Sequence, residues 1–299
     1  MVIVQLNGGL GNQMFQYALG RSIAERLSTV VKLDLSTFES NQHRRYGLHS
    51  FNIWEHIATE QEIEAIKGRK YTRKEALVLR TCSRLGFRPA TDALLSKGRV
   101  LRERHLHFDS EVLNATGSLY VEGYWQSEKY FKDIRDILLR EFTIKHGHDP
   151  QSQKLSETIQ STNSVSLHVR RGDYVHSKTA AEVLGFCGLD YYERSIDHIL
   201  ENVPAPHFLV FSDEPDWAKE NIRTKCPTTF VDHNNTSRDY EDLRLMSMCQ
   251  HHIISNSSYS WWSAWLSRFH SKIVIAPLQW FKNTAMTTAD LIPEAWLRL

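Results

Sequence analysis

The residues best suited to chemistry form a basic motif, HVRRGD at residues 168–173, which directly follows an apolar run. The run predicts a buried strand, and open α/β sheets bind ligands at the carboxyl ends of such strands. Because side chains alternate along a strand, only one of Arg170 and Arg171 can face a ligand. Arginine suits a phosphate because its planar fork donates two charge-assisted hydrogen bonds. We expect one arginine to bind phosphate and the other to brace a carboxylate such as Asp173; a structural Arg–Asp cluster is the alternative.

A glycine-rich motif, GGLGNQ at residues 8–13, stands between a predicted strand and a predicted helix. Glycines at such a place let backbone N–H groups approach a phosphate at the N-terminus of a helix. The pattern is similar to the dinucleotide fingerprint, and Asp34 stands where a ribose-binding acid would follow. The third glycine is replaced by Met14, however. The motif therefore fits a tight turn better than it fits NAD binding.

A third motif, SNSSYSWW at residues 255–262, offers serine hydroxyls at a predicted helix N-terminus, which can bind a phosphate. On the preceding predicted helix, Asp242 could accept two N–H bonds from guanine. The alternative is a serine cap and an ordinary surface acid. Trp261, Trp262 and Trp265 fit a core better than a stacking platform. The segment FSDEP, residues 211–215, predicts either a ligand-facing loop or a turn with a helix cap.

Two histidine patterns are poor candidates for a metal site. The segment HGHD, residues 146–149, lies in a polar stretch with no other ligand pattern near it, and His251 and His252 would diverge on a strand. The sequence also contains no Asp-x-Asp, the usual metal handle of Mn²⁺-dependent nucleotide-sugar transferases. We expect no metal and no other cofactor.

The elements that must position these motifs alternate between strand and helix. In the first half, residues 2–6 and 30–33 predict strands, while residues 15–27 and 131–142 predict helices; residues 40–104 are less regular. After a polar stretch, strands are predicted at residues 165–169, 208–211, 229–231, 253–254 and 273–276. Helices are predicted from Asp190, with Glu193 completing a capping-box-like pair, and over residues 239–249 and 258–269. The alternation predicts two Rossmann-like α/β domains, residues 1–155 and 156–299.

Composition excludes some classes of partner. Lys and Arg number 36 and Asp and Glu 35, so no net field favours nucleic acid or an anionic membrane. The four cysteines are far apart, which favours a reducing compartment over a disulfide framework. The N-terminal segment has no basic n-region and no long apolar run. We therefore expect a cytoplasmic, bacterial protein without a membrane span, with peripheral association at the inner membrane face left open.

Four motifs together carry a family resemblance: GGLGNQMFQYA, HVRRGDY, VFSDE and SNSSYSWWSAWL. In order and spacing the chain resembles the α-1,2-fucosyltransferases of glycosyltransferase family 11 over nearly its whole length. The resemblance implies a GT-B architecture, with two Rossmann-like, doubly wound domains facing each other across a cleft. It also implies GDP-β-L-fucose as donor, a galactose-terminated oligosaccharide as acceptor, inversion at the anomeric carbon and no metal.

The resemblance, extended to the α-1,6- and protein O-fucosyltransferases, implies roles for individual residues. Arg170 would bind the β-phosphate, His168 would contact the nucleotide, and Asp242, paired by its spacing with Ser258, would bind guanine. Gly11 and Asn12 would lie beside the donor from the N-terminal domain. The expected donor site is completed by Arg171, Ser212, Asp213, Asn256, Ser257 and Tyr259.

The general base stays open at this stage. The glutamate favoured in the α-1,6 relatives falls on Lys178 here. Asp173, His176 and Glu182 are candidates, as is a reaction without a base. We expect Asp173 to be essential, mainly as the group that orients Arg170, with a further role in steering the acceptor hydroxyl. Alternative functions are a fucosyltransferase of another linkage (α-1,6 or protein O-linked), a GDP-sugar-binding protein without catalysis, and a nicotinamide oxidoreductase.

Overall fold

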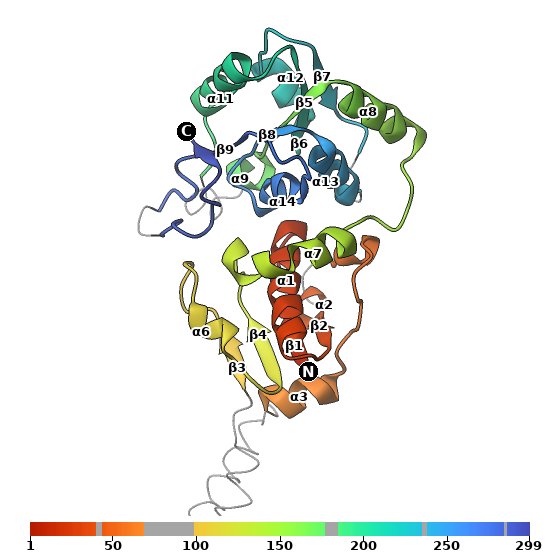
Figure 1. The fold of residues 1–299 in the computed structure, drawn as a ribbon, viewed down its shortest axis with the longest axis vertical. Helices are drawn as coiled ribbons and strands as arrows, with labels where there is room; N and C mark the ends of the chain where they lie inside the picture. The colour runs from red at the N-terminus through yellow and green to blue at the C-terminus, as the bar shows by residue number, and fades with distance from the viewer. Residues whose placement is uncertain (40–43, 69–98, 177–184, 235–237, 284–285) are drawn as a thin grey trace, which may run out of the picture.

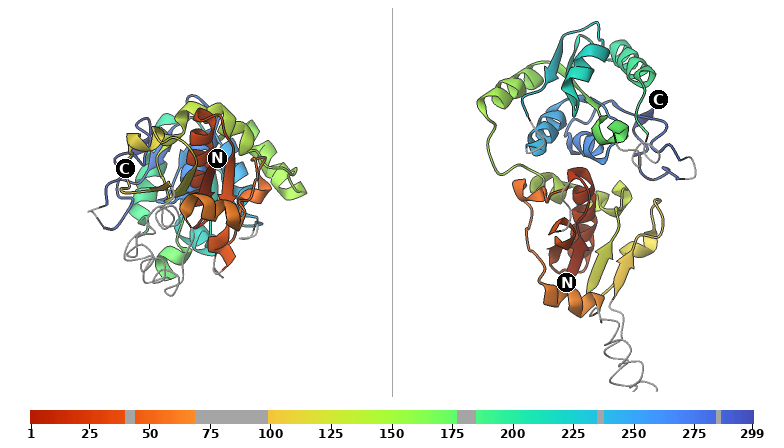
Figure 2. Two further views of the ribbon diagram at one scale, coloured as in Figure 1. Left: turned by 90° about the horizontal axis from the view of Figure 1, so that it is seen from below. Right: turned by 180° about the vertical axis from the view of Figure 1, so that it is seen from behind.

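The computed structural model describes residues 1–39, 44–68, 99–176, 185–234, 238–283 and 286–299, without the side chains of Asp173 and His176. Two α/β lobes lie one above the other and are joined by the segment between α7 (Arg135–Glu141) and α8 (Pro150–Ser161) (Figures 1 and 2). Each lobe is built on a parallel sheet. This is the GT-B architecture that the resemblance implies.

The first lobe has four parallel strands in the order β2-β1-β4-β3. They are β1 (Val2–Gln5), β2 (Val31–Asp34), β3 (Val100–Arg102) and β4 (Leu119–Glu122). Val2 and Val4 join the main core, whereas Ile3 packs on the opposite face with Tyr120. Burial on both faces explains why β1 reads as a continuous apolar run rather than as an alternation.

Helix α1 (Leu10–Arg26) connects β1 to β2. The sequence predicts one apolar face, but the helix is buried around most of its circumference, including Gln13, Gln16 and Arg21. The difference arises because the second lobe covers a side of α1 that would otherwise meet solvent. The remaining short elements of this lobe are α2 (Ser36–Glu39), η1 (Leu48–Ser50), α3 (Glu60–Lys67), α6 (Ser110–Leu113), η2 (Glu128–Tyr130) and η3 (Lys132–Ile134).

The second lobe has six parallel strands in the order β10-β9-β8-β5-β6-β7. They are β5 (Asn163–Val169), β6 (Pro206–Ser212), β7 (Thr228–Val231), β8 (His251–Ile253), β9 (Val274–Ala276) and β10 (Leu297–Arg298). The helices are α8, α9 (Gly172–His176), α11 (Leu189–Asn202), α12 (Pro215–Asn221), α13 (Asp239–Met248) and α14 (Ser258–Leu266). From β5 the chain forms β6 and β7 on one side of that strand, and then returns to form β8, β9 and β10 on its other side. The topological switch point, where doubly wound sheets bind ligands, therefore lies between β5 and β8.

Two local expectations differ from the structure. The predicted capping pair of α11 is absent: the helix begins at Leu189 with Gly188 as N-cap, so Asp190 lies inside its first turn, where it pairs with Arg194 at 2.9 Å. The predicted domain boundary, between residues 155 and 156, falls inside α8. Since α8 packs against α13, the chain crosses between the lobes earlier, over residues 142–149.

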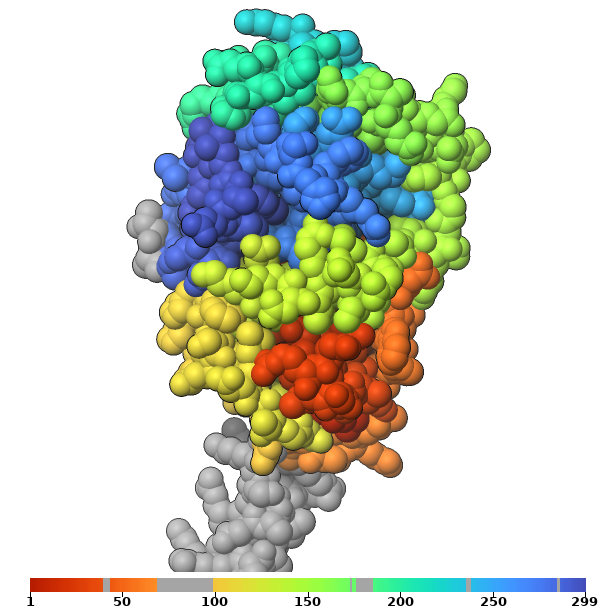
Figure 3. Space-filling model, viewed as in Figure 1, coloured from red at the N-terminus to blue at the C-terminus, as the bar shows by residue number. Residues whose placement is uncertain are grey.

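The two lobes share one hydrophobic core. Trp261 and Trp262 of α14 pack on Phe15 of α1, with ring centroids 4.5 and 5.0 Å apart, and the Trp262 indole N–H donates to the Gly11 carbonyl at 3.0 Å. Figure 1 shows the start of α1 reaching the second lobe beside α14, and Figure 3 shows the lobes in contact on this face. The expectation that the tryptophans form core is confirmed, and this core joins the lobes.

Gly11 should tolerate no side chain. A Cβ on this residue would lie 2.4 Å from the backbone carbon of Ser258 and from the backbone nitrogen of Tyr259. We expect Gly11→Ala to lower the free energy of unfolding by about 1–3 kcal/mol, because the lobes must move apart. Gly9→Ala is the matched control, since its Cβ would meet only the Arg44 guanidinium at 3.6 Å. Equal denaturation midpoints for the two variants would contradict the prediction.

Candidate functional site

His168 and Ser255 mark the switch point of the second sheet. His168 is the last but one residue of β5, and its Nδ1 lies 3.1 Å from the Oγ of Ser255, which follows β8. Burial, assisted by the nearby Arg170 charge, lowers the pKa of His168 to about 3. His168 is therefore neutral at physiological pH. It can hydrogen-bond a ligand, but it is a weak base and does not join the candidates for the general base.

Arg170 is held by Asp213. Its Nη1 lies 3.1 Å from Asp213 Oδ2, its guanidinium lies 5.5 Å from the centre of the Tyr174 ring, and a quarter of its side chain is exposed. A Cβ on Gly172 would lie 2.5 Å from the same Asp213 oxygen. Any side chain at position 172 would therefore force the Asp213 carboxylate to shift. Asp213, expected at the donor, serves in this structure to orient Arg170.

Arg171 also pairs with a carboxylate, but both arginines lie beyond the end of β5, so strand alternation does not separate their roles. Its Nε lies 3.0 Å from Glu214 Oε2, and its guanidinium stacks 3.9 Å from the Trp217 ring centre. Its backbone N–H donates to Asp213 at 2.9 Å, and the Ser212 hydroxyl accepts from the Glu214 N–H at 3.0 Å. The carboxylate braced by Arg171 is therefore Glu214. Arg171 and Ser212 support the site rather than line it.

The first turns of α1 and α14 converge beside the switch point of the second sheet, where Tyr259 lies next to His168. Asn12 Oδ1 accepts from the Ser258 hydroxyl at 2.7 Å and from the Gln126 amide at 2.8 Å. Neither helix has a side-chain cap at its N-cap residue, Gly9 or Ser257. Backbone N–H groups and the positive ends of two helix dipoles therefore meet at one place, which favours an anion. Gly11, Asn12, Ser257 and Ser258 are brought together as the resemblance implies.

Asn256 and Tyr259 have structural partners. The Asn256 amide, almost fully buried, donates to the Trp280 carbonyl at 3.0 Å, and its oxygen accepts from the Cys187 thiol at 3.6 Å. The Tyr259 hydroxyl donates to the Asp239 carbonyl, while its ring lies 5.5 Å from the His168 ring. Asn256 therefore shapes the loop before α14, and Tyr259 packs beside the switch point.

The surroundings of Asp242 make its carboxyl group costly to ionise. Burial, together with the neighbouring acids Glu241 and Asp239, raises its pKa to about 7, although the Asn234 amide donates to it at 2.7 Å and lowers the pKa in part. A buried carboxyl that is expensive to ionise is typical of ligand sites, where a partner in the ligand supplies the missing hydrogen bonds.

Several expected residues cannot be placed. The side chains of Asp173 and His176, and all of Lys178 and Glu182, lie outside the described residues. Gln126 and Asn234 contact expected site residues but stand in no motif, so the sequence gives no signal for them. Glu214, the partner of Arg171, stands in the VFSDE motif.

Residues of the histidine segment that the sequence disfavours as a metal site make other contacts. His148 Nδ1 lies 2.6 Å from a Glu241 oxygen, and Asp149 caps α8 and pairs with Arg238. Across the described part of the chain, no three His, Cys, Asp or Glu side chains are grouped so as to hold a metal. Asp34, the candidate for a ribose, is buried and accepts from the Tyr120 hydroxyl. Within the same ranges, no helix combines the length and the apolar character needed to cross a membrane.

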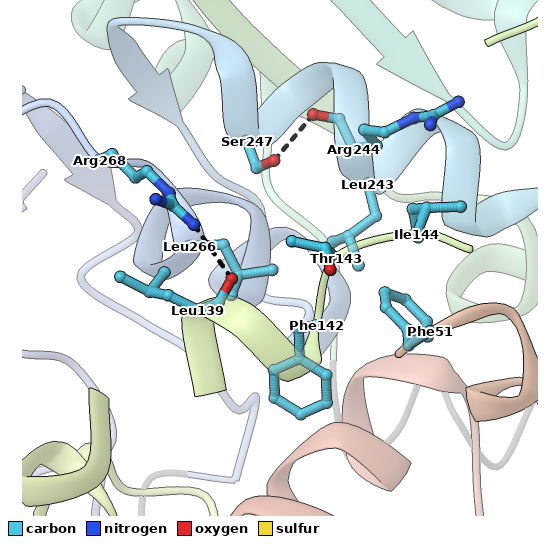
Figure 4. Close-up of a pocket in the computed structure, with 10 residues that line it drawn as sticks. All are labelled: Phe51, Leu139, Phe142, Thr143, Ile144, Leu243, Arg244, Ser247, Leu266 and Arg268. Atoms are coloured by element: carbon cyan, nitrogen blue, oxygen red, sulfur yellow. Dashed lines mark hydrogen bonds between the residues drawn. The ribbon is translucent and has the colours of Figure 1, made fainter. Parts of the chain in front are cut away.

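Two cavities lie away from these residues. One, of about 300 Å³, opens where the chain crosses between the lobes (Figure 4). It is lined by Phe51, Leu139, Phe142, Thr143, Ile144, Leu243, Arg244, Ser247, Leu266 and Arg268. The other, of about 610 Å³, runs beside β7 and α8. Neither is lined by a residue of the expected donor site.

Comparison with known proteins shows the family. The sequence profile described as glycosyl transferase family 11 matches residues 92–299. An alpha-1,2-colitosyltransferase of Escherichia coli is 33% identical, over 100% of this chain and 99% of that protein. This chain is a glycosyltransferase and belongs to glycosyltransferase family 11.

More distant similarities extend to animals and to solved structures. Galactoside alpha-(1,2)-fucosyltransferase 2 of Bos taurus is 28% identical over 56% of this chain and 48% of its own length. The crystal structure of fucosyltransferase NodZ from Bradyrhizobium superimposes with a TM-score of 0.46 at 12% identity, covering 88% of this chain and 91% of that one. So remote a structural likeness says nothing about substrate.

Asp242 should make the folded protein less stable as pH rises. Because its folded-state pKa lies above its unfolded value, the folded state holds the extra proton between about pH 4 and 7, and stability falls through that window. We expect Asp242→Asn to match wild type near pH 4 and to be more stable by about 2–4 kcal/mol at pH 8. Chemical denaturation at a series of pH values measures this, with the exposed Asp197→Asn as control. A pH-independent difference would contradict the assignment.

Proposed function

We propose that this glycosyltransferase moves L-fucose from GDP-β-L-fucose to the 2-hydroxyl of a galactose on a glycan acceptor, with inversion and without a metal. One observation carries the proposal: the uncapped first turns of α1 and α14 converge at the switch point where Asp213 orients Arg170. Family membership and the names of the two α-1,2-transferases above support the linkage and the class of sugar.

The geometry suits departure of GDP. As the anomeric C–O bond breaks, negative charge builds on the β-phosphate, and fixed N–H dipoles together with a guanidinium stabilise it without reorganising. Arg170 would supply the cation, while Ser258 and Asn12 would contribute polar groups from both lobes. Asp242 would accept two N–H bonds from guanine, and its ionisation would then be matched by those donors.

The acceptor hydroxyl must approach the anomeric carbon from the side opposite to GDP, and it loses its proton as the new C–O bond forms. Since His168 is too weak a base, the candidates stay Asp173, His176 and Glu182, or a transition state dissociative enough to need none. We assign Asp173 a mixed role, orienting Arg170 and steering the acceptor hydroxyl. Comparison of Asp173→Asn, His176→Ala and Glu182→Gln for transfer and for donor binding separates a base from an orienting residue.

GDP-colitose is a second candidate donor, because a relative that matches this chain over its full length is a colitosyltransferase. The same phosphate and guanine contacts would serve GDP-colitose, so the two donors differ only in the sugar. Competition between GDP-fucose and GDP-colitose at equal concentration decides which is preferred.

Arg170→Lys should nearly abolish transfer. Lysine keeps the charge but loses the two-pronged geometry, and the loss of a donor to developing charge typically costs ~100- to 1000-fold in kcat. The thermal midpoint should stay close to that of wild type, since Arg170 is partly exposed. Initial rates with GDP-fucose measure the effect, and Arg223→Lys on the surface is the control. Activity within a few-fold of wild type would show that Arg170 is structural.

Transfer should continue at full rate in excess EDTA, because the proposed site meets the phosphate charge with Arg170 and backbone dipoles alone. The measurement is the initial rate before and after chelation, with Mn²⁺ and Mg²⁺ added back separately. Loss of activity that either ion restores would refute metal independence.

A further inference from the structure

The switch point of the first sheet carries a loop that the donor site does not use. In the order β2-β1-β4-β3, the chain leaves β1 on one side and returns to its other side through β4, so the switch point lies between β1 and β4. The loop at residues 123–126 follows β4 directly. Ligands of doubly wound sheets bind at this position. Gln126 at the end of the loop donates to Asn12, which joins α1 to α14, so the loop borders the expected donor site.

The backbone of this loop is strained. Trp125, which is not glycine, has φ of 60°, and Gly123 has φ of 152°. A Cβ on Gly123 would lie 2.5 Å from the Glu103 Cβ and 2.9 Å from the Trp125 ring, so the turn is also tightly packed. Strained backbone of this kind persists only where the surroundings enforce it, and it clusters at ligand clamps.

Glu103 enforces the conformation. One carboxylate oxygen accepts from the Tyr124 N–H at 2.7 Å and the other from the Trp125 N–H at 2.9 Å. The Trp125 side chain is buried edge-on against Tyr130, with centroids 5.6 Å apart, and its indole nitrogen has no hydrogen-bond partner among the described residues. The loop is thus held rigid at a cost in free energy, which points to a functional reason for its shape.

The rigid loop exposes one large aromatic side chain. Tyr124 is 44% exposed although the residues on either side of it are closely packed. A single exposed aromatic residue is ordinary, but one fixed by a half-buried carboxylate on a strained turn at a switch point is not. An aromatic ring can receive the apolar C–H face of a pyranose while its hydroxyl remains available for hydrogen bonding.

We propose that Tyr124 is an acceptor-binding residue on which the galactose ring of the acceptor stacks, and that Glu103 is the positioning residue that fixes it. The proposal rests on the proposed function, since it assigns the acceptor to the first lobe, whereas Arg170 stands on the second. Stacking there would orient the acceptor hydroxyl toward the junction of Asn12 and Ser258.

The test compares acceptor and donor parameters of three substitutions. Tyr124→Ala and Tyr124→Leu remove the aromatic face and should raise the acceptor KM at least ~10-fold. They should leave unchanged both the donor KM and the slow release of GDP from GDP-fucose without acceptor. Tyr124→Trp keeps an aromatic face and should stay within about threefold of wild type. Phe269→Ala, an equally exposed aromatic on the second lobe, is the control and should change nothing.

Two results would overturn the assignment of Tyr124. One is an acceptor KM within twofold of wild type in both Tyr124→Ala and Tyr124→Leu; the other is an equal change in donor and acceptor KM, which indicates a role in folding alone. Wild-type protein that releases no GDP from GDP-fucose, with or without galactosides, would instead overturn the proposed function and, with it, the acceptor assigned here. Glu103→Gln should reproduce the acceptor KM effect of Tyr124→Ala, because an amide cannot accept both N–H bonds equally well.

Discussion

The arrangement of the molecule depends on the contact between the backbone of Gly11 and the start of α14, where no side chain fits. This contact brings two helix N-termini from different lobes to one point, and Asn12 then accepts hydrogen bonds from both lobes at once. The tryptophan face of α14 is buried by the same approach, so the interface that builds the site also supplies much of the shared core. The packing of the two lobes and the geometry of the candidate site therefore both depend on Gly11.

Around this junction one ionisable group costs stability at neutral pH. Arg170 is oriented by Asp213 and His168 is kept neutral by burial, whereas Asp242 is held where ionisation is unfavourable. A carboxylate held in this way destabilises the protein alone and is compensated when a ligand provides complementary donors. The strained loop after β4, on the first lobe, likewise has a conformation that costs free energy. Each lobe thus presents the switch point of its own sheet to the junction.

Much of this could be predicted from the sequence where the physical signal is local. The apolar run before Arg170 predicted β5. Strand alternation did not apply to Arg170 and Arg171, because both lie after β5 and their partners, Asp213 and Glu214, are neighbours in sequence. Strands β3 and β4 were missed because they span only three and four residues with little periodicity. Asn256 was assigned to the donor from its motif, whereas its partner Trp280 is brought near only by the fold. Tertiary contacts such as the hydrogen bond between Gln126 and Asn12 cannot be read from the spacing of residues along the sequence.

The most direct measurement is the structure of the product formed from GDP-fucose and a panel of β-galactosides. The account predicts a single fucosylated product, in which NMR shows an α-anomeric fucose correlated through the glycosidic bond to carbon 2 of galactose. A product linked to another hydroxyl, a β-anomer, or no transfer from GDP-fucose while another GDP-sugar reacts would contradict it.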